Sequence, residues 1–284
     1  MAQGNPLQDI VEARRSGKRI VAVSCYDFTT ARLVSQADVD MIIVGDSAAQ
    51  LMLGFDSTLH ATMDFMVTIT AAVRRAAPGL CVVADMPFLS YQLDRTTAIR
   101  NAGRFVTDGG ADLVKMEVCP AHIPTLKAIV DAGIAVMAHI GIRPQFIGAA
   151  SRPKAEATTA EQAMALIRLA KELIEAGTSA ILLEGIAAEV AGIITSNSPV
   201  PVIGCGSGPS CDGQVLIVAD ILGLTPRRPR FAAAFACLAD GYIAGVSSYS
   251  RHVRDGTFPD QSHCYHMKPG QREILEQMLK SRGD

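Results

Sequence analysis

The sequence lacks several features that define other classes of protein. Its seven cysteines are odd in number, form no CxxC pair, and are scattered through strand-like and loop segments. That pattern suits reduced thiols in a cytosol better than a disulfide framework. The N-terminal stretch has no apolar core of the kind that secretory leaders carry, and no apolar run approaches the length of a membrane span. We therefore expect a soluble, cytoplasmic protein.

Charge excess and nucleophile motifs are also missing. The formal net charge of −2 gives no reason to expect nucleic acid or an anionic membrane as a partner. The motif GxSxG is absent, and no cysteine lies beside a histidine at the end of a predicted strand. Hydrolase chemistry that depends on a nucleophilic serine or cysteine is therefore not expected.

Short apolar runs alternate with amphipathic helical stretches along the 284 residues, 49% of which are hydrophobic. Near-continuous apolar runs indicate strands that are covered on both faces, as in a parallel sheet with helices outside. We predict seven such strands, at 19–27, 40–46, 80–86, 112–118, 135–141, 180–185 and 201–204, and place an ambiguous eighth within 214–222. Helical patterns fall between them, at 62–77, 96–108, 122–131 and 159–176.

This alternation predicts a (βα)8 barrel of the TIM type with additional C-terminal helices. An open, doubly wound sheet is the alternative. No linker, repeat or low-complexity segment divides the chain, so we expect a single barrel domain over 1–284. Residues 231–284 are expected to form a mainly helical C-terminal extension that wraps the barrel or a neighbouring subunit. Apolar residues over more than one helical face of 231–252 favour packing against another subunit.

Polar residues recur where the predicted strands end, and in a parallel barrel those ends share one face, which carries the active site. They are Asp27, Asp46, Ser47, Asp85, Lys115, Glu117, His139 and Glu184. Side chains two residues apart share a strand face, so Lys115 and Glu117 should point the same way. Several carboxylates in one apolar cup repel one another unless a cation lies among them. Oxygen ligands of this kind favour a hard divalent ion such as Mg²⁺.

Each of these residues also has a purely structural interpretation. A lone Asp after a strand commonly caps a helix, and His139 alone is typical of a hydrogen-bonded core histidine. Lys115 could simply pair with Glu117 or another barrel acid. The glycine-bearing run GCGSG at 204–208 is a weak phosphate signal, and it could instead let backbone pack close to a substrate. HCYH at 263–266 is more typical of a polar surface segment than of a metal site.

An ordered set of short segments adds a family resemblance. The chain resembles the ketopantoate hydroxymethyltransferase family, whose members transfer a hydroxymethyl group to 3-methyl-2-oxobutanoate in the first committed step of pantothenate synthesis. Each segment is weak alone, and the order of the set makes it strong. The segments are VGDS (44–47), GFDSTL (54–59), AAVRRAAP (71–78), ADMPFLSY (84–91), VKME (114–117), HIGIRPQ (139–145), LLEG (182–185) and PVIGCGSG with CDGQVL (201–216).

The resemblance implies a (βα)8 barrel and a role for each strand-end residue. Asp46 and Asp85 would be direct Mg²⁺ ligands, with Glu117 completing the site directly or through water. Asp46 and Ser47 would hold the carboxylate end of the keto acid, with Lys115 as its cationic partner. Substrate binding would thus involve Asp46, Ser47, Asp85, Lys115 and His139, and Glu184 would accept the C3 proton. The one-carbon unit would come from 5,10-methylenetetrahydrofolate, and the family suggests a decamer.

The sequence departs from the family pattern in two loops at the edge of the site. Where relatives carry a glycine-rich loop ending in Lys-Val-Gln-Gly, this chain reads FIGAASRPKAEATT, in which Lys154 could replace the lysine. His60 stands where a proline is common. A paralogue that acts on another 2-keto acid therefore remains an alternative. So do a Mg²⁺-dependent carbon–carbon lyase of the isocitrate lyase and phosphoenolpyruvate mutase superfamily, and a non-catalytic scaffold.

Overall fold

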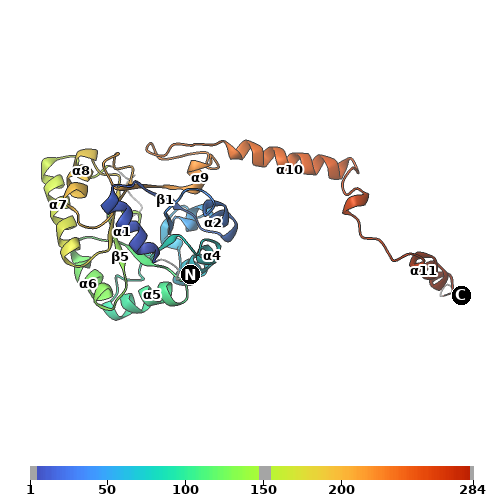
Figure 1. The fold of residues 1–284 in the computed structure, drawn as a ribbon, viewed down its shortest axis with the longest axis horizontal. Coiled ribbons are helices and arrows are strands. Elements are labelled where there is room, and N and C mark those ends of the chain that lie inside the picture. Colours follow the sequence, from blue (N-terminus) through green and yellow to red (C-terminus); the bar gives the residue numbers. More distant parts are fainter. Residues whose placement is uncertain (1–4, 147–154, 282–284) are drawn as a thin grey trace.

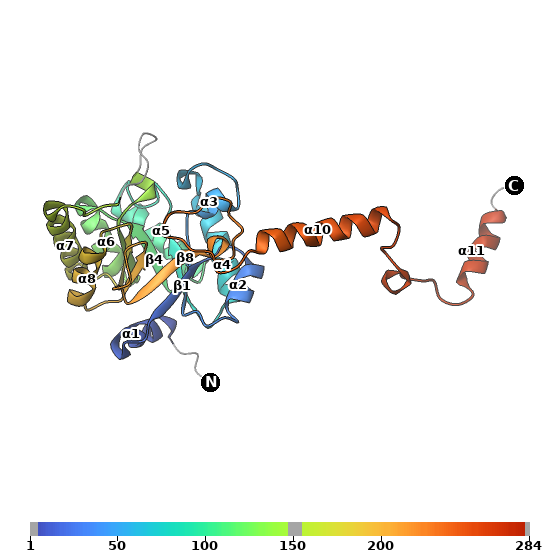
Figure 2. The same cartoon turned by 90° about the horizontal axis from the view of Figure 1, so that it is seen from above.

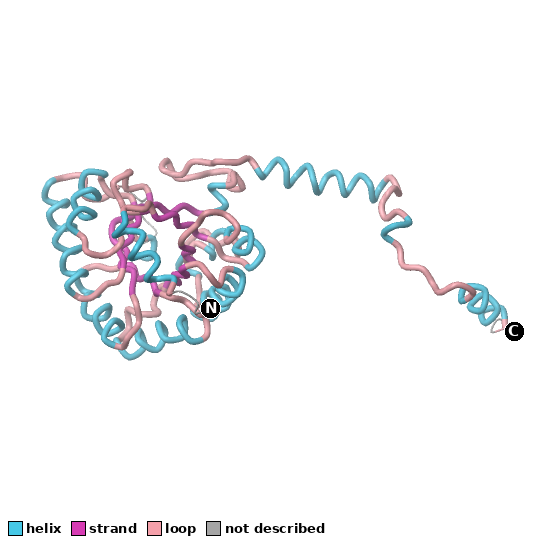
Figure 3. Tube along the Cα trace, viewed as in Figure 1, coloured by secondary structure: helices cyan, strands magenta, loops and turns pink. Residues whose placement is uncertain are grey.

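The computed structural model describes residues 5–146 and 155–281, and its centre is a closed barrel of parallel strands (Figures 1 and 3). Each strand pairs with its neighbours in chain order, and the last pairs with the first, which excludes the open sheet. The strands are β1 (Ile20–Ser24), β2 (Met41–Val44), β3 (Cys81–Asp85), β4 (Leu113–Glu117), β5 (Val136–Gly141), β6 (Ala180–Glu184), β7 (Val202–Cys205) and β8 (Gly213–Ile217).

Helices surround the barrel on the outside, and α1 lies across its N-terminal end (Figures 1 and 2). The helices are α1 (Pro6–Ser16), α2 (Phe28–Val34), α3 (Ala48–Leu51), α4 (Met63–Ala76), α5 (Arg95–Thr107), α6 (Ile123–Asp131), α7 (Ala160–Glu175), α8 (Ala188–Asn197), α9 (Val218–Ile221), α10 (Leu238–Arg254) and α11 (Gln271–Lys280). The four predicted helices correspond to α4, α5, α6 and α7.

Side-chain caps fix where several helices begin. Asp27, Thr62, Asp94 and Thr159 each accept a hydrogen bond from a backbone N–H in the first turn of the helix that follows. These bonds satisfy donors that the helix itself leaves unpaired. Asp27 therefore has the capping role and does not project into the barrel mouth. Only at β1 does the capping residue closely follow the end of the strand, since Asp27 comes three residues after Ser24.

Alternation along the strands divides the barrel into an apolar floor and a polar rim. Residues at every second position point inward, and those near the N-terminal ends form a buried apolar cluster that includes Ile20, Met41, Leu113, Met137 and Leu182. The next inward positions toward the carboxyl ends are occupied by polar groups. Apolar side chains thus fill the interior toward the N-terminal ends of the strands, and the polar groups gather at its C-terminal mouth.

Six of the seven predicted strands contain an observed strand, and the seventh, predicted at 201–204, overlaps β7, which ends one residue later at Cys205. The ambiguous eighth is β8, which begins one residue before the predicted range, and α9 occupies residues 218–221 of that range. All seven cysteines are free thiols. Among the described residues, no helix is long and apolar enough to cross a membrane.

The C-terminal extension leaves the barrel instead of wrapping around it (Figures 1 and 2). After α9 the chain forms a loop, and then α10 and α11 project away as an arm in which no described residue is buried. The amphipathic α10 begins only at Leu238, so residues 231–237 belong to the preceding loop. The expectation that the extension covers its own barrel is therefore wrong, whereas packing on a neighbouring subunit stays a prediction.

Candidate active site

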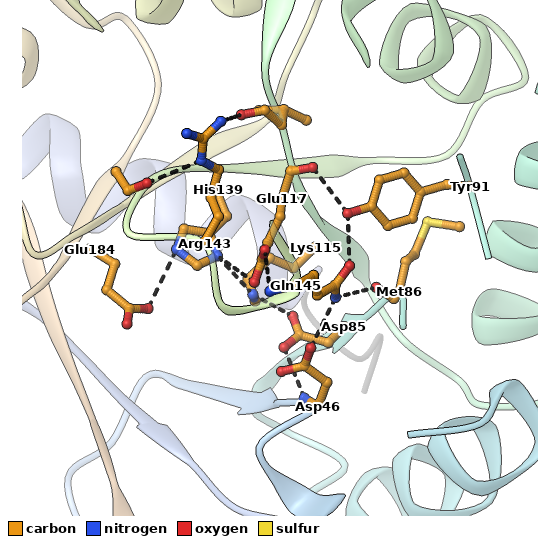
Figure 4. Close-up of polar contacts among 12 residues, drawn as sticks. Asp46, Asp85, Met86, Tyr91, Lys115, Glu117, His139, Arg143, Gln145 and Glu184 are labelled. Atoms are coloured by element: carbon orange, nitrogen blue, oxygen red, sulfur yellow. Dashed lines mark hydrogen bonds and ion pairs between the residues drawn. The ribbon is translucent and has the colours of Figure 1, made fainter. Parts of the chain in front are cut away.

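A pocket of about 190 Å³ opens at the C-terminal mouth of the barrel. The structure brings together all the residues that the sequence assigned to a site. Asp46, Ser47, Asp85, Lys115, Glu117, His139 and Glu184 all line this pocket. They come from the ends of β2, β3, β4, β5 and β6, so segments separated by more than a hundred residues meet here (Figure 4).

Lys115 is the central cation of the site. Its side chain is only 6% exposed, and its Nζ lies 2.8 Å from Oδ1 of Asp85 and 3.1 Å from Nδ1 of His139. Burial alone would lower the pKa of Lys115, but the carboxylates of Asp85, Asp46 and Glu117 outweigh it, so that the pKa is raised. Lys115 therefore stays protonated, and its side-chain partners are Asp85 and His139, not the Glu117 considered from the sequence.

Asp46 and Asp85 lie side by side because the chain turns sharply after β2. The backbone N–H of Asp46 donates a hydrogen bond to Oδ2 of Asp85 at 3.0 Å. Gly45 makes this turn possible, since a Cβ atom there would lie 2.9 Å from Oγ of Ser47 and 3.5 Å from Oδ2 of Asp85. Ser47 is held by the hydroxyl of Tyr26, at 2.8 Å between the two oxygens. The glycine between Val44 and Asp46 is thus a packing requirement of the site.

His139 connects Lys115 to Glu184. A lysine ammonium can only donate, so Nδ1 of His139 accepts from Lys115, and the proton of the neutral ring is on Nε2. Nε2 lies 3.4 Å from Oε2 of Glu184 and makes no well-aligned hydrogen bond with any described residue. Burial, followed by the charge of Lys115, lowers the pKa of His139 and keeps it neutral. Glu184 is 22% exposed and borders the open pocket.

Gln145 and Tyr91 are buried residues of the site that sequence reasoning missed. The backbone N–H of Gln145 donates to Oε2 of Glu117 at 2.9 Å, and its side-chain Nε2 donates to Oδ2 of Asp46 at 2.9 Å (Figure 4). Tyr91 orients that amide by donating to Oε1 of Gln145 at 3.0 Å. Gln145 thus ties two carboxylates together. Both residues lie in segments that carried the family resemblance, which was the available signal.

The acidic side chains of the site outnumber the cationic side chains near them. Burial and the neighbouring Asp85 raise the pKa of Asp46 to about 7. Burial also raises the pKa of Glu117 to about 9, with Lys115 acting in the opposite direction. Four acids share one lysine, so the pocket favours the arrival of either protons or a cation.

The carboxylate oxygens of the site are the type of ligand that a hard cation prefers. In the described part of the chain they are not arranged around a single position. Oδ1 of Asp85 is buried and has no well-aligned hydrogen bond, despite the nearby ammonium of Lys115. Its oxygen chemistry and that of Asp46 and Glu117 suit Mg²⁺. Within residues 5–146 and 155–281, however, no three His, Cys, Asp or Glu side chains are already gathered in a metal-binding group.

The remaining motifs noted in the sequence have structural roles or lie on the surface. In GCGSG, Gly206 adopts a left-handed backbone, and a Cβ there would lie 2.5 Å from the ring of Phe231. The absence of a side chain at this glycine therefore lets the loop between α9 and α10 pack against the pocket. His263 of HCYH is exposed and pairs with Asp260 at 2.7 Å, as a surface residue would. His60 stacks on Phe55 at 4.4 Å between ring centres. Lys154 lies outside the described residues.

A closed parallel barrel whose mouth holds buried acids, one lysine and one neutral histidine defines an enzyme of the (βα)8 class. A family model described as ketopantoate hydroxymethyltransferase matches residues 5–261. The 3-methyl-2-oxobutanoate hydroxymethyltransferase of Hyperthermus butylicus is 44% identical over 97% of this chain and 96% of its own. That of Moorella thermoacetica is 44% identical over 91% and 97%. The chain belongs to the ketopantoate hydroxymethyltransferase family and is thus a transferase.

Solved structures of proteins with other names share this fold. A 2,3-dimethylmalate lyase, of the phosphoenolpyruvate mutase and isocitrate lyase superfamily, superposes with a TM-score of 0.60 at 16% identity, over 98% of this chain and 99% of that one. Phosphonopyruvate hydrolase, in a complex with oxalate and Mg²⁺, superposes with a TM-score of 0.61 at 14% identity, over 98% and 96%. At this identity the likeness concerns the fold alone.

The raised pKa of Glu117 predicts how stability depends on pH in the metal-free protein. Between about pH 7 and 8.5 folded Glu117 holds a proton that the unfolded chain has released, so the free energy of unfolding should fall as pH rises. The slope for one proton is at most about 1.4 kcal/mol per pH unit. Urea denaturation across this range checks it. Glu117→Gln should flatten the dependence, whereas Glu175→Gln on the surface should not. A stability that rises with pH would contradict the assignment.

Proposed function

We propose that the protein is a 3-methyl-2-oxobutanoate hydroxymethyltransferase. It would remove the C3 proton of the keto acid and add a hydroxymethyl group from 5,10-methylenetetrahydrofolate and water. The products would be 2-dehydropantoate, an intermediate of pantothenate biosynthesis, and tetrahydrofolate. The observation that carries this proposal is the juxtaposition of Lys115, His139 and Glu184 in one pocket of a chain that belongs to this family.

The pocket offers both a polar and an apolar surface to a branched keto acid. Lys115 supplies the positive charge for the carboxylate end, and Ser47 and the backbone around Asp46 lie beside it. Ile43, Leu182 and Val215 line the floor of the same pocket and suit the isopropyl group. The keto acid would therefore lie with its polar end at the acids and its alkyl end on the barrel core.

Asp46, Asp85 and Glu117 are the residues that would hold Mg²⁺. When bound, the ion would withdraw charge from the carbonyl of the keto acid and so favour the enolate. Glu184 is placed to accept the C3 proton, because it is the acid nearest the open side of the pocket and, among the described residues, pairs with no Lys or Arg side chain. The Nε2–H of His139 faces the carboxylate of Glu184, with 3.4 Å between Nε2 and Oε2.

Glu184→Gln should separate proton removal from substrate binding. The amide keeps the shape of the side chain but cannot accept the proton, so kcat should fall on the order of 10²–10⁴-fold, with little change in the KM of the keto acid. Exchange of the C3 proton in D₂O, followed by proton NMR without folate, reports the same step. Glu189→Gln, on the surface of α8, is the matched control. Wild-type exchange in Glu184→Gln would make His139 the next candidate base.

We also propose that the protein is a homo-oligomer of more than two chains, in which α10 packs against another copy. Every third or fourth residue of α10 is apolar and exposed, and these residues form one stripe: Leu238, Tyr242, Val246, Tyr249 and Val253. The barrel also has an apolar surface that its own helices leave uncovered. The helix that directly follows β8, α9, spans only four residues, and Val21 on the outer face of the adjacent β1 is 43% exposed. A second copy of this chain would cover both apolar surfaces.

Light scattering at micromolar concentration tests the assembly. We expect a mass above that of a dimer for the wild type and a smaller species for the double variant Tyr242→Asp with Val246→Asp. Ser247→Asp lies on the opposite side of α10 and should leave the mass unchanged. A monomeric wild type would refute the proposal.

A further inference from the structure

Three arginines lie at the mouth of the pocket, in the loop that connects α9 to α10. Arg227, Arg228 and Arg230 are exposed, and the residues between and after them, Pro229 and Phe231, line the pocket. We refer to these three residues as the arginine cluster. The close contact of Phe231 with Gly206 holds this part of the loop against the barrel. The cluster therefore lies at the outer edge of the active site.

The base of the loop is tied down, which gives the cluster a defined location. The backbone N–H of Phe235 donates to the carbonyl of Ile221 at 2.8 Å, and that of Leu238 donates to the carbonyl of Leu222 at 2.9 Å. Thr225 donates its hydroxyl proton to the buried Asp220. The loop thus leaves the barrel and returns to the same point, carrying the arginines over the mouth.

The arginine cluster has no anionic partner of its own. None of its guanidinium groups forms a hydrogen bond or an ion pair with any residue in the described part of the chain. The loop from Leu222 to Cys237 contains no Asp or Glu. Asp220, the nearest acid in the sequence, is buried beneath the loop and occupied by Thr225. Three guanidinium groups next to one another repel, so the cluster suits an anion supplied from outside.

The sign of the charged side chains changes from the interior of the site to its mouth. The acids Asp46, Asp85, Glu117 and Glu184 lie inside, whereas the arginine cluster lies outside. An elongated ligand with several carboxylates at one end would be repelled from the interior and held at the mouth. Phe231, 39% exposed, adds an aromatic face between the two regions. The combination fits a ligand with an aromatic body and an anionic tail.

We infer that the arginine cluster binds the glutamate tail of the folate cosubstrate, and that it favours folates with several glutamates. This inference rests on the proposed function. Each added glutamate contributes one carboxylate, and Arg is well suited to bind carboxylates through paired hydrogen bonds. The reacting end of the folate would then point into the pocket, toward Glu184.

Steady-state kinetics with monoglutamate and triglutamate forms of 5,10-methylenetetrahydrofolate test the inference. We expect the wild type to have a lower KM for the triglutamate. In the triple variant R227Q/R228Q/R230Q, that KM should rise on the order of tenfold, because exposed ion pairs each contribute a few-fold. The preference for the triglutamate should disappear, and raised salt should weaken it in the wild type. R75Q/R100Q/R168Q, with the same charge change on exposed helix positions, is the control.

The folate-independent exchange of the C3 proton distinguishes this inference from the proposed function. A wild type that neither exchanges nor turns over would refute the proposed function. Normal exchange with equal KM values for the two folates, in wild type and triple variant alike, would overturn the arginine assignment alone. Loss of exchange in the triple variant would also overturn it, because the arginines would then serve the keto acid or the fold. The single variant R228Q, with a smaller rise in KM expected, guards against a folding defect.

Discussion

The ammonium group of Lys115, buried among carboxylates, is the interaction on which the site depends. It lies within contact distance of Asp85 and His139, and its charge offsets part of the repulsion among four acids. A buried charge without a partner is costly, so neither the lysine nor its acids would be stable in this barrel alone. Burial, together with the same charge, lowers the pKa of His139 and keeps it neutral, and the ammonium donates to Nδ1, which leaves Nε2–H facing Glu184.

The parallel barrel converts this pairing into a site that is open on one side. Every second residue of a strand points inward. One inward position further along each strand, the environment therefore changes from an apolar floor to a charged rim. The loops then add hydrogen-bond donors to the site at different depths. Gln145 bridges acids in the interior, whereas the arginine cluster lies at the mouth. A keto acid below and a folate above would match this order.

The sequence was sufficient to predict the barrel and the charged rim because both depend on local patterns. Apolar runs that end in a charged residue indicate a strand and the direction of its last side chain, as for Asp85 and Glu184. Gln145 was missed because its partner Asp46 lies 99 residues away, and no local pattern reports that bond. The course of the arm was also unpredictable: the amphipathic pattern of α10 indicates an apolar face, but not what covers it. The strand β8 was ambiguous in the sequence because it is short and has no clear apolar run.

Binding of Mg²⁺ tests most directly whether the buried carboxylates serve to hold a cation. Isothermal titration calorimetry of Mg²⁺ in the presence of 3-methyl-2-oxobutanoate would compare the wild type with Asp85→Asn and with Asp56→Asn, an exposed control. We predict that Asp85→Asn stays folded and binds Mg²⁺ at least about tenfold more weakly, because one charged oxygen ligand is lost. Unchanged Mg²⁺ affinity in a folded Asp85→Asn protein would contradict the account.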